Sequence, residues 1–334
     1  MTEPTKPADT KPVTPEIKAA EVKGAALAEK VAEKAAKPSP VSLKPVAAPP
    51  FTILDKEGRH NERYIKMLAY GEHGSGKTYL MATACSVPRM NDVIMISAEG
   101  GEMTIDTDDK SHPFHKIDSI RIEDFNGVAK TFDFLKLHCD LRDRPFDPAV
   151  EEKLWELEAK NKQLGVAELK AKQEKPRRYQ TTIIDSLTEV ESYCMSKILD
   201  NNPDMSLDEV TETAEWKHYK IQHTTMMNLI RRYRDLPMHV LMTCARQYIQ
   251  DESKRQLFSP AMTGKLTSKV QGFVDIVGYL EVLPATTPDG NPPRKMHVQP
   301  NARWNAKNRI SSYKKPFFED PTMAKILKEI GMTK

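Results

Sequence analysis

The sequence predicts a three-layer α/β fold, in which helices cover both faces of a mostly parallel sheet. Three observations support this prediction. From about residue 51 onward, short apolar runs of strand length alternate with helical patterns. A glycine-rich octapeptide, residues 71–78, stands between such a run and a helical segment. A later apolar run ends in Asp185, and a parallel sheet would bring that carboxylate to the edge where the octapeptide lies.

The first 50 residues differ in composition from the rest of the chain. They consist mainly of Ala, Lys, Pro, Glu and Thr and contain no aromatic residue. Such a segment cannot bury enough apolar surface to offset the entropy lost on ordering. We therefore expect residues 1–50 to form a disordered leader that tethers or solubilises the protein, with partner docking as the alternative role. Residues 51–334 are expected to form one folded domain.

Hydropathy and cysteine usage exclude several classes of protein. No apolar run approaches the roughly 18 residues that a membrane span needs, and the N-terminus lacks the apolar region of a signal peptide. We therefore expect a cytoplasmic protein with no membrane partner. The cysteines lie far apart with no C-x-x-C pair, which favours reduced, buried thiols over a metal site or a disulfide framework. They are Cys85, Cys139, Cys194 and Cys244.

The net charge of +3 is unevenly distributed along the chain. Residues 1–50 carry 8 Lys and Arg against 6 Asp and Glu, residues 51–253 carry 28 against 35, and residues 254–334 carry 14 against 6. A basic last quarter suits a polyanionic partner, although solvated lysine-rich surfaces are also common.

The octapeptide Gly71-Glu72-His73-Gly74-Ser75-Gly76-Lys77-Thr78 matches the pattern G-x-x-x-x-G-K-[ST] in full. In this pattern the glycines allow close backbone approach to phosphates, the lysine reaches the β- and γ-phosphates, and the hydroxyl ligates Mg²⁺. Backbone N–H groups and the positive end of the following helix would converge on the phosphate oxygens. We therefore expect ATP and Mg²⁺ as cofactors. The expected nucleotide-binding residues are Gly71, His73, Gly74, Ser75, Gly76, Lys77, Thr78 and Tyr79.

The remaining elements follow in chain order. Apolar runs of strand length predict the strands, and a helix following the third strand has apolar residues at helical spacing. Asp320-Pro321-Thr322 begins a last helix, which Gly331 ends. The expected strands are 64–70, 92–98, 119–122, 179–184, 238–244, 273–283 and 295–299.

Two segments interrupt the alternation of strands and helices. Residues 141–178 are rich in Glu and Lys and predict a charged helical insertion, either a solvated arm or an arm that contacts another subunit. Residues 201–236 contain a second helical stretch with an apolar stripe that we expect to lie in the core. The stripe consists of Trp216, Tyr219, Met226, Met227, Ile230 and Tyr233.

Hydrolysis needs a metal-holding acid and a residue that orients water, in addition to a phosphate loop. Asp185 ends an apolar strand, so we expect it to hold Mg²⁺ together with Thr78. The next residue is Ser186 and not an acid, so the water-orienting base must come from another strand. Glu99 follows the second strand and precedes two glycines, which makes it the candidate, with Glu102 as the alternative and a plain surface role left open.

These motifs, taken in order, resemble those of RecA-core P-loop NTPases, and in particular phage nucleotide-binding proteins of the single-strand-annealing kind. In that family the base is likewise a Glu at the end of the strand after the phosphate-loop helix. The resemblance covers roughly residues 62–310 and implies a host-cytoplasmic location if the protein is phage-encoded. It rests on 71–78, 97–101, 184–188, 241–246, 263–265, 273–277 and 304–309.

The resemblance also implies an oligomer. Lys307 and Arg309 are similar to the Lys-x-Arg pair that RadA-like proteins direct at a neighbouring subunit's γ-phosphate, which implies catalytic roles for both in a ring or filament. Ordinary basic residues in a basic segment are the alternative.

The segment 247–264 corresponds to the DNA-contacting loop of the RecA relatives. Gln247 lies about two positions beyond the place expected of the nucleotide-sensing Gln, which falls at Ala245 or Arg246. Basic residues interleaved with aromatic residues suit a single strand, while a hairpin without a ligand is the alternative. The expected DNA-binding residues are Lys254, Arg255, Lys265 and Lys269.

We therefore expect an ATP hydrolase stimulated by single-stranded DNA, acting in recombination or replication by annealing or strand exchange. A single-strand-binding or replication protein is a further expected partner. The rival is an assembly or helicase-loader ATPase that remodels a protein. A nucleotide kinase would need a phosphate-gripping lid, which we do not find, and a nucleotide binder without turnover is the minimal alternative.

Overall fold

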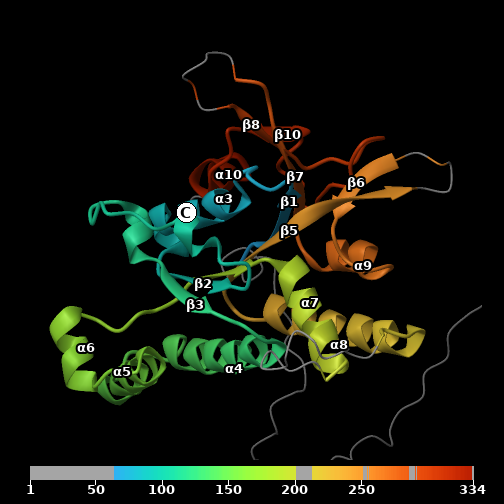
Figure 1. Ribbon diagram of the computed structural model, residues 1–334. Coiled ribbons are helices and arrows are strands. Elements are labelled where there is room, and N and C mark those ends of the chain that lie inside the picture. Colours follow the sequence, from blue (N-terminus) through green and yellow to red (C-terminus); the bar gives the residue numbers. More distant parts are fainter. Residues whose placement is uncertain are drawn as a thin grey trace, which may run out of the picture. The chain divides into compact units, whose positions relative to one another are not determined.

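A mostly parallel sheet runs through the part of the chain that the computed structural model describes, residues 64–200, 213–250, 254, 256–285, 290 and 292–332 (Figure 1). The expected leader 1–50 and Arg255 lie outside these residues. Along the sheet the order is β10-β8-β7-β1-β5-β4-β2-β3, with β6 paired to β5 and β9 paired to β7. The strands are β1 (Lys66–Gly71), β2 (Val93–Ser97), β3 (Asp118–Arg121), β4 (Thr181–Asp185), β5 (His239–Gln250), β6 (Gln256–Pro260), β7 (Ile276–Val282), β8 (Arg294–His297), β9 (Lys307–Asn308) and β10 (Phe317–Glu319).

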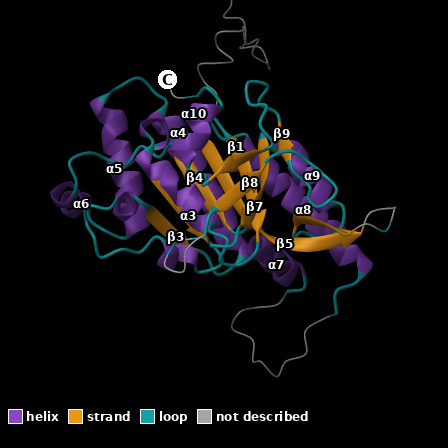
Figure 2. Ribbon diagram, turned by 90° about the horizontal axis from the view of Figure 1, so that it is seen from above, coloured by secondary structure: helices purple, strands orange, loops and turns teal. Residues whose placement is uncertain are grey.

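Six strands run parallel to one another, in the order β7, β1, β5, β4, β2 and β3, whereas β8 and β10 add antiparallel pairs at one edge. Helices lie on both sides of the sheet, as the view from above shows (Figure 2). The described helices are α3 (Lys77–Ala82), α4 (Phe125–Arg142), α5 (Pro148–Lys162), α6 (Val166–Lys172), α7 (Leu187–Ile198), α8 (Trp216–Arg234), α9 (Leu266–Phe273) and α10 (Met323–Glu329).

The strand side chains alternate between two cores, one on each face of the sheet. Leu68 and Tyr70 of β1 belong to the cluster formed with α4, α7, α8 and α9. Met67 and Ala69 belong to the cluster formed with α3 and α10. This period of two is what a strand buried on both faces requires. The predicted class, a three-layer α/β fold with a mostly parallel sheet, is confirmed.

Polar side chains cap the first turn of several helices, among them α4 and α7. Asp124 accepts a hydrogen bond from Gly127 N at 2.6 Å and so caps α4. Ser186 caps α7 by accepting from Glu189 N at 3.4 Å. Such caps satisfy N–H groups that have no partner within the helix. Capping therefore accounts for the serine that follows Asp185.

The segment 141–178 contains the end of α4 together with α5 and α6, and it is tied to the sheet rather than free in solvent. Trp155, Ala159 and Leu169 form a small core of their own. The buried carboxylate of Glu158 accepts hydrogen bonds from Gln173 Nε2 at 2.9 Å and from Arg177 N at 2.8 Å.

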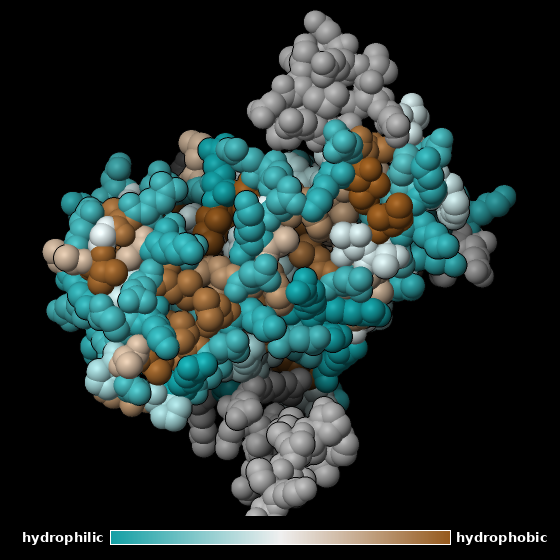
Figure 3. All heavy atoms as spheres, turned by 90° about the horizontal axis from the view of Figure 1, so that it is seen from below, coloured by the Kyte–Doolittle hydropathy of each residue, from teal (hydrophilic) through white to brown (hydrophobic). Residues whose placement is uncertain are grey.

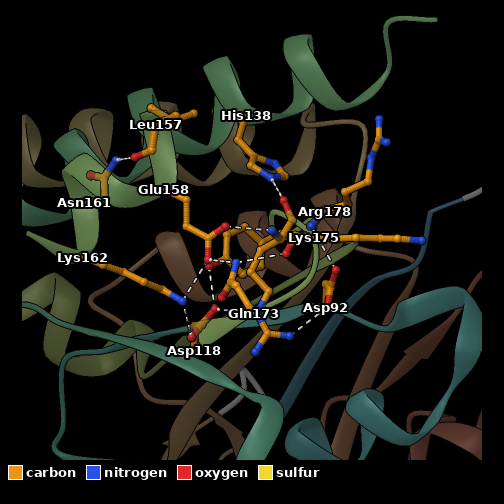
Figure 4. A network of polar contacts seen from close by, with 12 residues as sticks. Asp92, Asp118, His138, Leu157, Glu158, Asn161, Lys162, Gln173, Lys175 and Arg178 are labelled. Atoms are coloured by element: carbon orange, nitrogen blue, oxygen red, sulfur yellow. Dashed lines mark hydrogen bonds and ion pairs between the residues drawn. The ribbon is translucent and has the colours of Figure 1, made fainter. Parts of the chain in front are cut away.

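Ion pairs extend this network to the edge of the sheet. Lys162 contacts both Glu158 at 2.9 Å and Asp118 of β3 at 3.2 Å (Figure 4). The Arg177 side chain pairs with Asp92 at 3.2 Å and with Asp118 at 3.3 Å. The helical insertion is thereby held at one edge of the sheet, so that its polar residues are not all solvated.

The prediction that the apolar stripe on α8 lies in the core is wrong for two of its residues. Met226, Ile230 and Tyr233 are fully buried, but Trp216 is 86% exposed and Tyr219 is 40% exposed. The packing of α8 on α7 and α9 buries the apolar residues in the middle and at the end of the helix, whereas in the first turn it is His218 that is buried and Trp216 that is exposed.

Two further predictions concern the whole described chain. The four cysteines are buried and free, as predicted. Among the described residues, each helix is too short or too polar to span a bilayer.

Candidate active site

The glycine-rich loop joins the buried strand β1 to α3 at the carboxyl edge of the sheet. Gly74 and Gly76 have φ values of 73° and 90°, in the left-handed region that glycine adopts without strain. The loop is closed by hydrogen bonds from Ser75 N and Ser75 Oγ to Glu72 O, at 3.2 and 2.7 Å. The result is the compact turn that a phosphate-binding loop requires.

Lys77 is buried beneath this loop. Its Nζ donates to Glu72 O at 2.8 Å and to Gly71 O at 3.3 Å. Burial lowers the pKa of Lys77, and the nearby carboxylates of Glu99 and Asp185 partly oppose that shift. A buried ammonium group bound only to carbonyl oxygens is well suited to attract a polyanion.

Asp185 lies at the end of β4 and is 1% exposed. Its Oδ2 accepts a hydrogen bond from Thr78 Oγ1 at 2.9 Å, and its Oδ1 accepts one from the Thr243 hydroxyl. Burial raises the pKa of Asp185, the two hydroxyl groups oppose the shift, and the charge of Glu99 adds to it. The carboxylate and hydroxyl oxygens of Asp185 and Thr78 are the donor types that Mg²⁺ prefers, so the residues fit this metal.

Glu99 faces the same cavity as the loop. The cavity has a volume of about 530 Å³, which is within the range of small-molecule sites. Glu102, the alternative base, instead accepts a hydrogen bond from Ser97 Oγ at 2.7 Å. Of the two acids, only Glu99 lines the cavity. Its lining residues are His73, Gly74, Gly76, Lys77, Thr78, Tyr79, Glu99, Thr104 and Arg294.

Two larger cavities, of about 650 and 700 Å³, lie elsewhere. One lies beside β3 and the other between α7 and the root of the β5–β6 hairpin, and neither is lined by the phosphate loop. We therefore assign the chemistry to the smaller cavity, because of these three cavities it is the one lined by the loop, together with the carboxylate of Glu99.

The structure brings two residues to this site that the sequence reasoning missed. Thr243 is a fully buried hydroxyl in the middle of the otherwise apolar part of β5, and that unusual position was a usable signal. Arg294 opens β8 and donates from Nε to Ser75 O at 3.1 Å. Nothing in the local sequence distinguishes Arg294 from the other basic residues of the last quarter.

Lys307 and Arg309 do not reach the loop of their own chain. β9 pairs with Ile276 and Val277 at the amino end of β7, whereas the loop lies beside the carboxyl end. The Lys307 Nζ donates to Gln271 O and Val274 O, at 2.7 and 2.9 Å, and Arg309 donates to Gly272 O. Both side chains bind carbonyls at the end of α9.

The expected DNA-contacting segment is an antiparallel hairpin of β5 and β6 that extends beyond the sheet (Figure 1). Lys254 is exposed between the two strands, while Lys265 and Lys269 are exposed on the first part of α9. The two α9 lysines lie close enough to His223 of α8 to lower its pKa, after the effect of burial. The described basic residues thus occupy two places, the hairpin and α9.

Arg246, at the root of the hairpin, contacts the phosphate loop directly. Its guanidinium forms an ion pair with Glu72 and lies 4.4 Å from the Phe258 ring centroid. Gln247 points elsewhere and donates to Pro260 O and Met262 O, both at 2.9 Å. Of the residues considered for the sensor position, Ala245 is the strand partner of Gly71, and Arg246 is the one whose side chain forms an ion pair with the loop.

One comparison with known proteins, a match to a family model, covers this site. The family model AAA_24, described as an AAA domain, matches residues 63–310. A search of curated proteins found no match. Among solved structures, the chain is similar to the flagellar accessory protein FlaH from Methanocaldococcus jannaschii, at 11% identity and a TM-score of 0.35, over 76% of this chain and 84% of that chain. It is also similar to the RadB recombinase, at 11% identity and a TM-score of 0.33, over 70% of this chain and 79% of that chain. The family match spans most of the chain and includes the phosphate loop, Glu99 and Asp185, so this protein belongs to the AAA_24 family of AAA domains and is a P-loop NTPase.

Proposed function

We propose that the protein is an ATPase that is stimulated by single-stranded DNA and acts in annealing or strand exchange. The observation that carries the proposal is the ion pair between Arg246 and Glu72, because it joins the root of the β5–β6 hairpin to the phosphate loop. A polymer that moves the hairpin would thereby alter the loop. Reciprocally, a nucleotide that reshapes the loop would alter the hairpin.

The residues around the loop have distinct roles in this proposal. Lys77 binds the phosphates, while Thr78 and Asp185 hold Mg²⁺. Mg²⁺, when bound, neutralises charge on the phosphate oxygens. Glu99 orients the attacking water and accepts its proton, since it is the acid that lines the cavity beside Lys77.

Oligomerisation is a second part of the proposal. Lys307 and Arg309 lie away from their own loop, so they would act on nucleotide only across a subunit interface in a ring or filament. A variant lacking both basic groups should then restore activity when it is mixed with a Glu99→Gln variant. If mixtures show no more turnover than the two variants separately, the proposed shared site is wrong.

Exposed side chains on the hairpin and α9 support binding to a single strand. Tyr248 is 62% exposed and lies against Phe258, with ring centroids 4.8 Å apart and the rings tilted by 51°. Aromatic faces can stack on bases, and exposed lysines such as Lys265 and Lys269 can contact phosphates. The basic last quarter adds a favourable long-range field.

The proposal is tested by ATP turnover with and without single-stranded DNA, and by the salt dependence of oligonucleotide binding. Replacing Lys265 and Lys269 by Gln should lower the slope of log affinity against log salt by about 1.4, because each phosphate contact on a single strand contributes about 0.7. The matched control replaces Lys314 and Lys328, two exposed lysines of the same quarter, and should leave the slope unchanged. Absence of both stimulation and binding at low salt would exclude DNA as the partner.

A partner-remodelling ATPase is the second candidate, and exposed apolar groups on α8 favour it. Trp216, Tyr219 and Ile221 are 86%, 40% and 50% exposed. The face seen from below shows hydrophobic patches among hydrophilic side chains (Figure 3). Exposed apolar groups of this kind commonly mark protein contacts. This candidate predicts turnover that responds to a protein and is indifferent to DNA.

A further inference from the structure

Arg294 lies over the phosphate loop, although it comes from the far end of the chain. Its Nε donates to Ser75 O at 3.1 Å. A Cβ added to Gly76 would lie 3.0 Å from the same nitrogen. The side chain also lines the cavity that contains Lys77, Thr78 and Glu99. The guanidinium is therefore part of the wall against which any bound nucleotide must lie.

The backbone of Arg294 is held firmly on both sides. Arg294 N donates to Asp320 Oδ1 at 2.8 Å, and Asp320 N donates to Arg294 O at 2.7 Å. The residue also pairs with Val282, at the carboxyl end of β7. Within the described part of the chain, no carboxylate forms an ion pair with Arg294. The site thus holds a positioned cation whose charge no described acid neutralises.

The order of the strands indicates which end of a nucleotide Arg294 would meet. β1 leads into the loop, and β5, β4 and β2 follow on one side of it, so that Asp185 and Glu99 both lie on that side. β7 and β8 lie on the other side, which places Arg294 opposite the two acids. In the proposed site the metal-holding acid and the water-orienting acid would act at the terminal phosphates, so a bound nucleotide would have those phosphates on the side of Asp185 and Glu99. The nucleoside end is left on the side of Arg294.

We propose that Arg294 binds the nucleoside end of the nucleotide, by stacking its guanidinium on the base and donating to the ribose. This inference rests on the proposed nucleotide site. Arginine suits the task because its planar, delocalised cation can stack and donate hydrogen bonds at the same time. Arg294 would then set affinity for the nucleoside part, while Lys77 and the loop set affinity for the phosphates.

Calorimetric measurement of ligand affinities, on the full chain with Mg²⁺, tests whether Arg294 binds the nucleoside part and the loop binds the phosphates. The ligands are ADP, a non-hydrolysable ATP analogue and inorganic tripolyphosphate. An Arg294→Gln variant should bind ADP and the ATP analogue more weakly by the same factor, roughly tenfold, which corresponds to one lost contact of this kind. Its affinity for tripolyphosphate should equal that of the unaltered protein, and kcat at saturating ATP should be unchanged while KM rises.

Other outcomes would overturn the inference. Equal weakening of all three ligands would mean that Arg294 only positions the loop through Ser75. If only the affinity for the ATP analogue falls, Arg294 contacts the γ-phosphate. If the affinities for all three ligands are unchanged, Arg294 does not bind the nucleotide. The matched control is Arg303→Gln, an exposed arginine in the loop before β9, which should change none of the affinities.

The proposed nucleotide site itself is tested separately by Lys77→Ala. If Lys77→Ala abolishes binding of all three ligands and Arg294→Gln changes none of them, the inference on Arg294 fails and the nucleotide site stands. If the unaltered protein binds neither nucleotide, the proposed function fails, and the inference on Arg294 fails with it.

Discussion

Gly101 lies directly against the carboxylate of Asp185. A Cβ added at position 101 would overlap Asp185 Oδ2, and it would also lie 3.5 Å from the Met95 side chain. The neighbouring Gly100 has a φ of 74° and so needs glycine for its backbone conformation, whereas Gly101 needs glycine for space. The two glycines after Glu99 therefore serve different purposes, and Gly101 leaves room for the carboxylate of Asp185, the proposed Mg²⁺ ligand.

A Gly101→Ala variant should therefore displace Asp185 and weaken Mg²⁺-dependent nucleotide binding. We expect the nucleotide affinity in the presence of Mg²⁺ to fall about tenfold, which corresponds to roughly 1.4 kcal/mol of binding free energy. The measurement is nucleotide affinity as a function of Mg²⁺ concentration. Gly165→Ala is the matched control, because a Cβ there meets no atom within 4 Å. Unchanged Mg²⁺ dependence in Gly101→Ala would contradict the role assigned to Asp185.

An Asp185→Asn variant should be more stable than the unaltered protein without metal, yet it should lose its response to Mg²⁺. Burial raises the pKa of Asp185 in the folded state above that of an unfolded chain. The folded state therefore binds this proton more tightly, and stability falls as the pH rises through the raised pKa. At pH 7 the buried, ionised carboxylate of Asp185 lowers the free energy of unfolding, and the neutral amide of the Asp185→Asn variant would not.

Thermal unfolding at several pH values measures this effect. Without metal, Tm of Asp185→Asn should exceed that of the unaltered protein by a few degrees at neutral pH, and the gap should narrow as the pH is lowered. Mg²⁺ with nucleotide should raise Tm of the unaltered protein but raise that of the variant much less. Asp108→Asn, at an exposed acid, is the control. A lower Tm for metal-free Asp185→Asn would contradict the argument.

The sequence predicted those parts of the site that follow from local pattern and parallel pairing. The loop is a continuous motif, and Asp185 and Glu99 each follow an apolar strand, so the parallel sheet brings them to one edge. Thr243 and Arg294 depend instead on register between strands that are far apart in the chain. Register of that kind is set by the packing of the whole sheet and leaves no local pattern.

The misjudged exposure of Trp216 has a related cause. Helical periodicity shows which residues share a face, but it does not show how far along the helix a partner covers that face. α8 is 19 residues long, and its buried apolar residues lie in its carboxyl-terminal part, whereas the buried residues nearer its start are the polar His218 and Gln222. A local pattern was also insufficient for Lys307 and Arg309. Their Lys-x-Arg spacing does not show at which end of the sheet the two side chains lie.

A Glu99→Gln variant should lower ATP turnover by about 10²- to 10⁴-fold while it retains nucleotide binding. The expected factor is that of losing a general base. Binding should persist because Lys77, Thr78 and Asp185 are untouched. Glu102→Gln is the matched comparison, since this acid is engaged with Ser97. Equal turnover in Glu99→Gln and the unaltered protein, or a larger loss in Glu102→Gln, would show that the base is assigned wrongly.

An Arg246→Gln variant should lose most of the stimulation of turnover by single-stranded DNA, at little cost in stability. The Glu72 side chain is 65% exposed, so its ion pair with Arg246 should contribute only about 0.2–1 kcal/mol to folding. The pair nevertheless joins the hairpin to Glu72, whose carbonyl oxygen accepts hydrogen bonds from Ser75 and Lys77. A small loss in the free energy of unfolding can therefore accompany a large loss of coupling.

A double-mutant cycle with Glu72→Gln separates coupling from other effects of the arginine. If the pair transmits the signal, each single variant should lower the ratio of stimulated to basal turnover by a similar factor, and the double variant should lower it no further. If the double variant lowers the ratio of stimulated to basal turnover by the product of the two single factors, Arg246 acts instead through its contacts with Phe258 and Tyr279. Because the pair is partly exposed, rising salt should weaken stimulation in the unaltered protein more than in either variant, when compared at equal DNA saturation. If neither Arg246→Gln nor Glu72→Gln changes the stimulation by DNA, the ion pair does not couple the hairpin to the loop.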